Sequence, residues 1–153
     1  MLPLFLYIQA TGSNKTVMDN HKDTRWKQRF QNFQKAFKLL EKAVKIEKLT
    51  EIERGGLIQF FEVTFELSWK ILKDYLEVQG FIVKSPRESI KMAIQNEIIQ
   101  NGYLWMDALE DRNLTTHIYD EEIIKTISHK IINEYYPAIE QLYSFFKVQY
   151  ESR

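Results

Sequence analysis

Ten residues at positions 111–120 combine side chains that could carry out chemistry. Arg112 supplies a permanently charged guanidinium whose planar fork matches a phosphate, Asn113 supplies a donor and an acceptor, and His117 can exchange protons near neutral pH. These are the groups that a metal-free cleavage of a phosphodiester needs. In such a reaction His117 would take the proton of a ribose 2′-hydroxyl or protonate the leaving 5′-oxygen, and Arg112 would stabilise charge on the phosphate.

The spacing of Arg112 and His117 raises a geometric problem. Five residues along an ideal helix correspond to roughly 140° in projection, so the two side chains do not share a face. One histidine also cannot remove and donate a proton at once. Either the backbone is irregular in this segment, or a second copy of the chain completes the site across a dimer axis. On spacing alone, an arrangement without chemistry is open too, in which Arg112 pairs with Asp111 on the surface and His117 caps a helix.

Helical patterns precede this segment. Large apolar residues recur every three or four positions over residues 26–44 and predict a first long helix. Thr50 stands three residues before Glu53, which is a capping-box pattern, and Gly80 supplies a stop signal. The second helix is therefore expected over residues 51–79.

Further helices are expected on both sides of the candidate segment. Ser85, followed by proline and then by glutamate at the third helical position, begins a shorter helix that should end near Ile99. Tyr103–Glu110 is predicted to be a short helix that leads into the candidate segment. Asp120 can cap a last long helix, and Pro137 should kink it because proline lacks a backbone donor and clashes with the preceding turn.

The sequence predicts an all-α fold, an antiparallel up-and-down four-helix bundle with an extra short helix, because no segment alternates with period two. A chain of 153 residues fits one domain, which we expect over residues 19–153. Residues 1–18 precede the patterned region, and we expect them to be a disordered tail or the result of an upstream start site.

The composition restricts the classes of function. Basic and acidic residues balance to a net charge of zero, so no overall cationic field attracts nucleic acid and any RNA contact must be local. The absence of cysteine excludes disulfides, a thiolate nucleophile and cysteine-ligated zinc, and it is compatible with the cytoplasm. The apolar residues 2–10 are too few to cross a bilayer, so no membrane association is expected.

The order of the residues resembles a known family. Arg112-x4-His117-x-Tyr119 matches the R-x4-H-x-Y motif of HEPN-superfamily toxins encoded beside minimal nucleotidyltransferases, and Asn113 fits the polar residue usually found after the arginine. Over residues 25–150 the chain resembles the branch labelled nucleotidyltransferase substrate-binding protein. The motifs that carry this wider resemblance are Phe61-Glu62-x-x-Phe65-Glu66-Leu67-x-Trp69-Lys70-x-Leu72-Lys73-Asp74-Tyr75-Leu76, Ser85-Pro86-Arg87-Glu88 and Trp105-x6-Arg112-Asn113-Leu114.

The resemblance implies a two-fold homodimer in which the Arg112–His117 segments of both chains face each other, which would solve the problem of the single histidine. It implies a ribonuclease toxin that uses Arg112, Asn113 and His117 and needs no metal or cofactor of its own. Its partner would be a minimal nucleotidyltransferase antitoxin that uses ATP and Mg²⁺ to transfer AMP onto Tyr119. An anionic nucleotide two residues from His117 would fill the cleft and repel an RNA phosphate. DNA is not expected as a substrate.

Two carboxylates are candidates for supporting roles. Glu62 and Glu66 lie one turn apart on one face of the second helix. Ion pairing of both with Lys70 or Lys73 is the simplest expectation, and positioning of Arg112 is the alternative. Asp111 is the other supporting candidate. The tryptophans Trp69 and Trp105 are expected to be core or dimer-interface anchors rather than platforms for stacked bases.

Two further functions remain open from the sequence. The chain could be a non-catalytic docking subunit that presents substrate to a nucleotidyltransferase, and the zero net charge favours this alternative mildly. It could also be a purely structural helical dimer.

Overall fold

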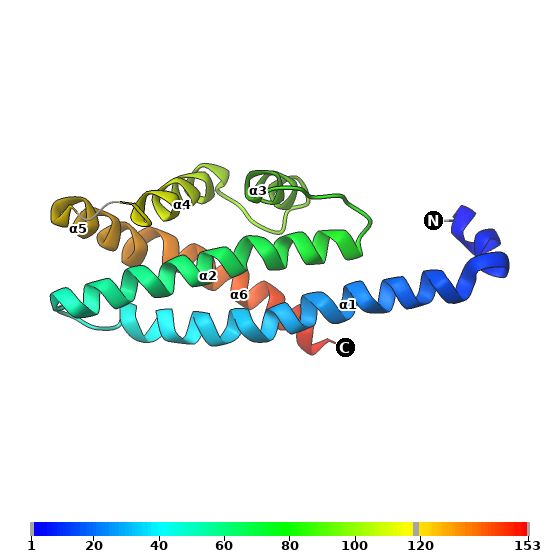
Figure 1. Ribbon diagram of the computed structural model, residues 1–153, viewed down its shortest axis with the longest axis horizontal. Helices are drawn as coiled ribbons and strands as arrows, with labels where there is room; N and C mark the ends of the chain where they lie inside the picture. The colour runs from blue at the N-terminus through cyan, green and yellow to red at the C-terminus, as the bar shows by residue number, and fades with distance from the viewer. Residues whose placement is uncertain (1, 118–119, 153) are drawn as a thin grey trace.

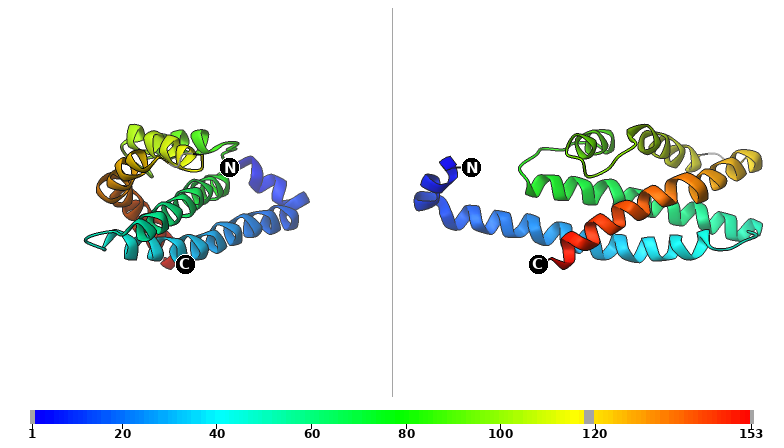
Figure 2. Two further views of the ribbon diagram at one scale, coloured as in Figure 1. Left: turned by 60° about the vertical axis from the view of Figure 1, so that its left-hand side comes forward. Right: turned by 180° about the vertical axis from the view of Figure 1, so that it is seen from behind.

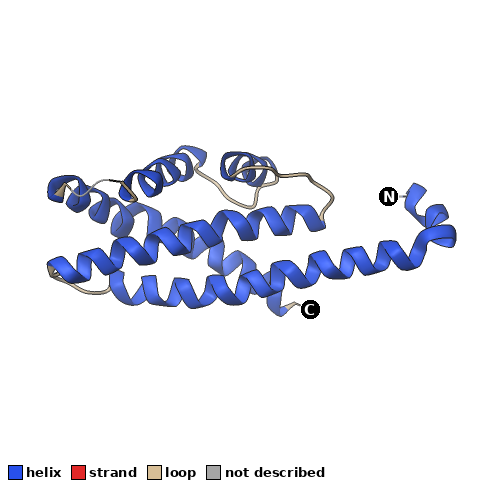
Figure 3. Ribbon diagram, in the orientation of Figure 1, coloured by secondary structure: helices blue, strands red, loops and turns tan. Residues whose placement is uncertain are grey.

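Helices make up nearly all of the part of the chain that the structure describes. The computed structural model describes residues 2–117 and 120–152, with side chains from residue 21 onward, and it contains no strand within these ranges (Figure 3). The predicted all-α class is confirmed. The elements in chain order are α1 (Leu2–Val44), α2 (Glu51–Val78), α3 (Pro86–Gln95), α4 (Gly102–Thr115), α5 (Glu121–Lys130), the π-helix η1 (Ile131–Tyr135) and α6 (Tyr136–Glu151).

The helices form an antiparallel bundle. α1 and α2 lie side by side and run in opposite directions, and α3 and α4 together lie over α2 as a third, interrupted arm (Figure 1). α5, η1 and α6 form one continuous rod that crosses the α1–α2 pair obliquely (Figure 2). The predicted helical bundle is confirmed, with α1, α2 and the α5–η1–α6 rod as its long members and α3 and α4 as its shorter ones. No helix among the described residues is long and apolar enough to cross a membrane.

The core is built from the apolar stripes that the sequence displays. Trp26, Phe30 and Phe33 of α1 are almost completely buried. Phe30 stacks on Tyr143 of α6 with ring centroids 5.8 Å apart, and Phe61 of α2 stacks on the η1 tyrosine. Offset aromatic pairs of this kind add about 0.5–1.5 kcal/mol to the burial of the rings themselves. The aromatic pairs therefore join the α5–α6 rod to both long helices.

Helix α2 has the ends that the sequence predicted. The Thr50 hydroxyl accepts from the Glu53 N–H at 3.1 Å, and the Glu53 carboxylate accepts from the Thr50 N–H at 2.9 Å. At the other end Gly80 has φ +99°, a left-handed conformation that glycine adopts without strain. The Phe81 N–H donates to the Leu76 carbonyl and the Gly80 N–H to the next carbonyl along, which completes a Schellman motif.

Thr50→Ala should lower the free energy of unfolding by about 1 kcal/mol, because the Glu53 N–H loses the hydroxyl that caps it. Urea unfolding followed by circular dichroism measures this loss. Thr126→Ala is the matched control, since that exposed hydroxyl bonds only within its own helix, to Glu122. Equal stabilities of the Thr50 and Thr126 variants would show that the capping box contributes nothing.

Three helices differ from the sequence prediction in their extent. α3 ends at Gln95, before the predicted end near Ile99. α1 begins at Leu2, well before the predicted start at Trp26, and its first part extends beyond the other helices (Figure 1). α4 continues past the predicted end at Glu110 and reaches Thr115, so Arg112 is a helical residue. The domain boundary at residue 19 stays a prediction.

The predicted disturbance at Pro137 takes the form of a π-helix. η1 lies directly before the proline, whose ring would otherwise clash with the preceding turn. The wider turn of a π-helix adds one residue to the spacing of the backbone hydrogen bonds and accommodates the missing donor. Tyr135, the last residue of η1, is 1% exposed and points into the core.

Candidate functional site

Arg112 lies in the last turn of α4, against α2. Its Nη2 is 3.0 Å from Glu66 Oε2, and its Nη1 donates to Asn113 Oδ1 at 3.3 Å. Its Nε is buried without a hydrogen-bond partner in the described part of the chain. The guanidinium is thus held in one orientation on the surface between two helices. The arrangement in which Arg112 pairs with Asp111 is wrong.

Glu66 is the centre of a small network on α2. Besides Arg112, its carboxylate accepts from the Trp69 indole N–H at 3.1 Å and pairs with Lys70 Nζ at 3.4 Å. The expected pairing of Glu66 with a lysine and the alternative role beside Arg112 therefore occur together. The Glu66 carboxylate is therefore shared between two cations, Arg112 of α4 and Lys70 of α2.

Glu62, one turn earlier on α2, behaves differently from Glu66. Its Oε2 accepts a 2.6 Å hydrogen bond from the Thr115 hydroxyl of α4. No ion pair of Glu62 occurs among the described residues, so the predicted pairing with a lysine is wrong for this position. The Thr115 and Arg112 contacts together fasten the end of α4 to α2 at two successive turns.

Asp111 faces the opposite side of α4. Its Oδ2 is 2.7 Å from Lys130 Nζ and accepts a short hydrogen bond from the Tyr135 hydroxyl of η1. Burial, with the Asp111 hydrogen bond as the second cause, raises the pKa of Tyr135 far above its ordinary value, so the phenol stays protonated and donates. Asp111 therefore supports the position of α4 and does not face the groove beside Arg112.

Asn113 and His117 are both exposed. α4 ends at Thr115, and the His117 N–H donates to the Leu114 carbonyl at 3.1 Å in the turn that follows. Within the described residues the imidazole has no hydrogen-bond partner, so it is not held toward Arg112 inside one chain. Tyr119 lies outside the described residues.

A groove runs beside Arg112 between α2 and the end of α4. Its volume is about 630 Å³, which is within the range of small-molecule sites. Most of its lining side chains are polar, and His117 is not one of them. The lining residues are Gly55, Ile58, Gln59, Glu62, Val63, Glu66, Leu67, Arg112, Thr115 and Thr116.

Comparison with known proteins identifies the family. The model of the family described as "Nucleotidyltransferase substrate binding protein like" matches residues 28–148, which is most of the chain. The chain belongs to this family. The resemblance drawn from the sequence motifs is confirmed, and no curated protein matches the chain.

Two solved structures have a fold similar to that of this chain. A protein from Thermus thermophilus is 32% identical, with a TM-score of 0.67 over 72% of this chain and 94% of that chain. A chain in the crystal structure of a mutant of the toxin–antitoxin MntA-HpeT is 16% identical, with a TM-score of 0.65 over 79% of this chain and 95% of that chain. The nucleotidyltransferase substrate-binding fold of our chain is therefore that of both proteins.

Three contacts of this family member were not predicted from the sequence. Lys130 and Tyr135 are the partners of Asp111, and Thr115 is the partner of Glu62. Arg112 and Thr115 are three residues apart and therefore share a face of α4. The sequence could have indicated this shared face, but the predicted helix ended before both residues. No sequence signal links Asp111 to partners 19 and 24 residues away.

Proposed function

We propose that this chain is the toxin of a toxin–antitoxin pair, a cytoplasmic, metal-independent endoribonuclease whose site uses Arg112, Asn113 and His117. One observation carries the proposal, namely that the Arg112 guanidinium is fixed by Glu66 at the wall of an open groove, with Asn113 bonded to it. A preorganised guanidinium stabilises phosphate charge without having to reorganise during the reaction. The exposed His117 follows directly after the end of the same helix.

The reaction requires two proton transfers. The 2′-oxygen of a ribose attacks the adjacent phosphorus while one imidazole accepts its proton. The bond from phosphorus to the 5′-oxygen breaks, and that oxygen takes a proton from a second imidazole, which leaves a 2′,3′-cyclic phosphate and a 5′-hydroxyl. Arg112 donates hydrogen bonds to the phosphate oxygens throughout, and Asn113 holds the guanidinium from its other side.

A homodimer supplies the second imidazole in this proposal. One chain carries a single His117, and the other two histidines lie far from it in the sequence, at positions 21 and 129. Around a two-fold axis, two copies of Arg112 and His117 converge on one phosphate. Each chain then provides one proton acceptor or one proton donor in each turnover.

Control of the toxin comes from a partner enzyme. We propose that a minimal nucleotidyltransferase, with its own ATP and Mg²⁺, transfers AMP to the Tyr119 hydroxyl and releases pyrophosphate. The family description and the toxin–antitoxin assembly of the structural neighbour support this partner. The added phosphate places a negative charge two residues from His117, where it repels the RNA backbone.

The test combines growth with intact-protein mass. Expression of the chain alone should arrest growth, His117→Ala should relieve the arrest, and coexpression with the neighbouring nucleotidyltransferase should add the mass of AMP. Tyr119→Phe should remove the added mass and remain toxic in the presence of the partner, while Tyr103→Phe, at an exposed tyrosine of α4, should remain modified. Growth unaffected by the wild-type chain, with no RNA cleavage by the purified protein, would contradict the nuclease proposal.

A second candidate is a non-catalytic docking subunit of the nucleotidyltransferase. The observation that favours it is the ion pair itself, because Glu66 already neutralises much of the charge that Arg112 would offer to RNA. In this case the partner would copurify with the wild-type chain and with His117→Ala equally. Neither protein would cleave RNA or affect growth.

A further inference from the structure

The groove beside Arg112 has a carboxylate that the proposed chemistry does not use. Glu62 accepts one hydrogen bond, from Thr115 at its Oε2, and no cation balances its charge directly among the described residues. A carboxylate has about four acceptor positions, so most of those on Glu62 remain open. A ligand in this groove would therefore meet an acceptor without a competing lysine or arginine.

The groove also contains an unexplained glycine. Gly55 lies inside α2, where glycine destabilises a helix relative to alanine, yet a Cβ atom at this position would meet nothing within 4 Å. The backbone of Gly55 is ordinary α-helix, so neither packing nor backbone geometry requires glycine at this position. Gly55 lines the groove, and the missing side chain widens it. The space is consistent with an occupant that approaches the α2 backbone.

The separation of Glu62 from the Arg112–Glu66 ion pair suits a nucleotide, with its phosphate at Arg112 and its base near Glu62. Glu62 and Glu66 are one helical turn apart, a rise of about 6 Å, and Arg112 is bonded to Glu66. A strand whose phosphate lies at Arg112 would place an adjacent base in the groove near Glu62. Aliphatic side chains such as Ile58 and Leu67 on the groove wall can contact the face of the base.

We infer that this groove binds a guanine base of the RNA substrate, with Glu62 as the acceptor for the base. The inference rests on the proposed function and names the substrate preference of the same site. Guanine offers two adjacent donors, N1–H and the N2 amino group, on its Watson–Crick edge, and unstacked bases of single-stranded RNA are recognised on this edge. On the same edge, adenine and cytosine each have one amino donor next to an acceptor, and uracil has one donor between two acceptors. An acceptor atom of each of these bases would therefore face a carboxylate oxygen and repel it.

Binding should be measured apart from cleavage. Single-stranded oligonucleotides that are 2′-O-methylated at every position cannot be cut by attack of the 2′-oxygen, and their affinity can be followed by fluorescence anisotropy. We expect a strand containing one guanine among uracils to bind about ten- to a hundredfold more tightly than the same strand with inosine, adenine or cytosine at that position. Inosine is the sharpest comparison because it lacks only the N2 amino group.

Three variants test the residues. Glu62→Gln keeps the size of the side chain and an acceptor for Thr115, and it should bind all four strands with nearly equal affinity. Gly55→Leu should weaken guanine binding at least tenfold by filling the groove. Gly56→Ala is the matched control, because its Cβ would meet only a Phe60 ring carbon at 4.0 Å and Gly56 does not line the groove. Gly56→Ala should raise the melting temperature and leave binding unchanged.

The outcomes separate this inference from the nuclease proposal. Cleavage of ordinary RNA with equal affinity for all four strands would overturn the inference alone, as would a guanine preference that survives Glu62→Gln. A guanine preference without cleavage would overturn the nuclease alone, and the absence of any RNA binding would overturn both. If Glu62→Gln and Gly55→Leu instead abolish copurification of the nucleotidyltransferase while RNA affinity is unchanged, the groove binds protein and the inference is wrong.

Discussion

Arg112→Ala should lower the rate of the proposed RNA cleavage by about 10²–10³-fold, because the phosphate would lose its preorganised hydrogen-bond donors as charge develops on it. Arg112→Lys should lose nearly as much, since an ammonium keeps the charge but cannot form the bidentate fork. The rates should be measured on one defined oligonucleotide under single-turnover conditions, which separate the chemical step from binding and product release.

The fold should tolerate the loss of Arg112. Its side chain is 28% exposed, and the Glu66 carboxylate keeps Lys70 and the Trp69 indole as partners. The free energy of unfolding should fall by less than about 1 kcal/mol, as is usual for ion pairs near the surface. An equally slow but unfolded Arg112→Ala protein would show that the arginine is structural.

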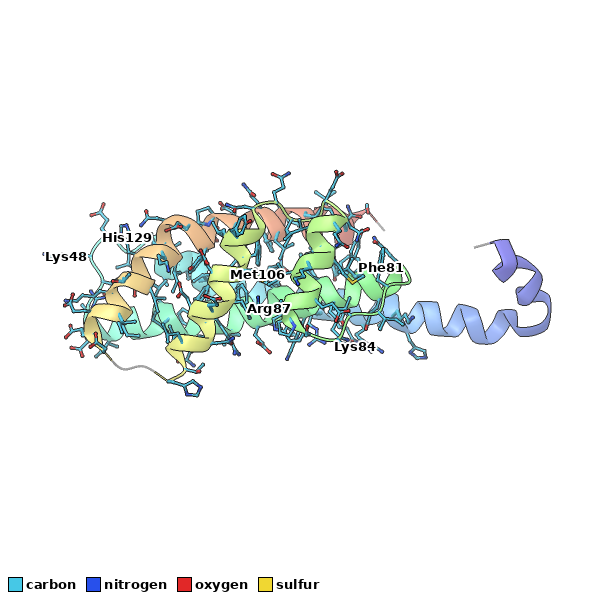
Figure 4. The ribbon with its side chains drawn as sticks, turned by 90° about the horizontal axis from the view of Figure 1, so that it is seen from above. Lys48, Phe81, Lys84, Arg87, Met106 and His129 are labelled. Atoms are coloured by element: carbon cyan, nitrogen blue, oxygen red, sulfur yellow. The ribbon has the colours of Figure 1, made fainter. Side chains whose placement is uncertain are left out.

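Arg87 provides the matched control for Arg112. It is an exposed arginine of α3 that lies beside Met106 of α4, with Nη1 3.6 Å from the sulfur (Figure 4). It forms no ion pair among the described residues and is not one of the groove residues. Arg87→Ala should keep the full cleavage rate. A similar loss in both variants would mean that general positive charge, rather than the Arg112 site, supports the reaction.

The parts of the fold that the sequence predicted are those set by local patterns. The stripe that begins at Trp26 is buried, and the ends of α2 follow from Thr50, Glu53 and Gly80. Each of these features depends on residues within one or two helical turns of one another. Side-chain spacing and capping chemistry therefore suffice to predict them.

The features that the sequence did not predict depend on contacts between distant segments. The polar residues after Glu110 have the composition of a loop, but Arg112 and Thr115 are bonded to α2, and the helix ends five residues later than predicted. The relation of Arg112 to Glu66 was open from the sequence because lysine partners for Glu66 were available nearby. Tertiary contacts thus override local propensity at the candidate site.

Asp111→Ala should destabilise the protein more than any other single change at the site. The Tyr135 hydroxyl would lose its acceptor, and this side chain is 1% exposed, so water cannot replace the carboxylate. Lys130 is one-third exposed and can turn toward solvent, which lowers its share of the loss. From the two lost contacts we expect a decrease of about 2–3 kcal/mol in the free energy of unfolding, because a buried donor without a partner destabilises the folded state.

The pH dependence of this loss follows from the raised pKa values. The Asp111 hydrogen bond raises the pKa of Lys130 above its ordinary 10.5, and a raised pKa stabilises the fold below the unfolded value and ceases to do so as pH rises through the folded value. The difference between wild type and Asp111→Ala should therefore stay constant between about pH 7 and 9 and shrink only at more alkaline pH. Urea unfolding at a series of pH values measures it.

Variants of Tyr135 and Asp107 distinguish a specific cluster of Asp111, Lys130 and Tyr135 from a general effect of charge. Tyr135→Phe alone should lose about 1 kcal/mol, and adding it to Asp111→Ala should lose little more, since the unpaired hydroxyl is then absent. Asp107→Ala, at an exposed position one turn earlier on α4, should change stability by less than about 0.5 kcal/mol. Strict additivity of Asp111→Ala and Tyr135→Phe would contradict the cluster, because independent sites add and residues that share a buried hydrogen bond do not.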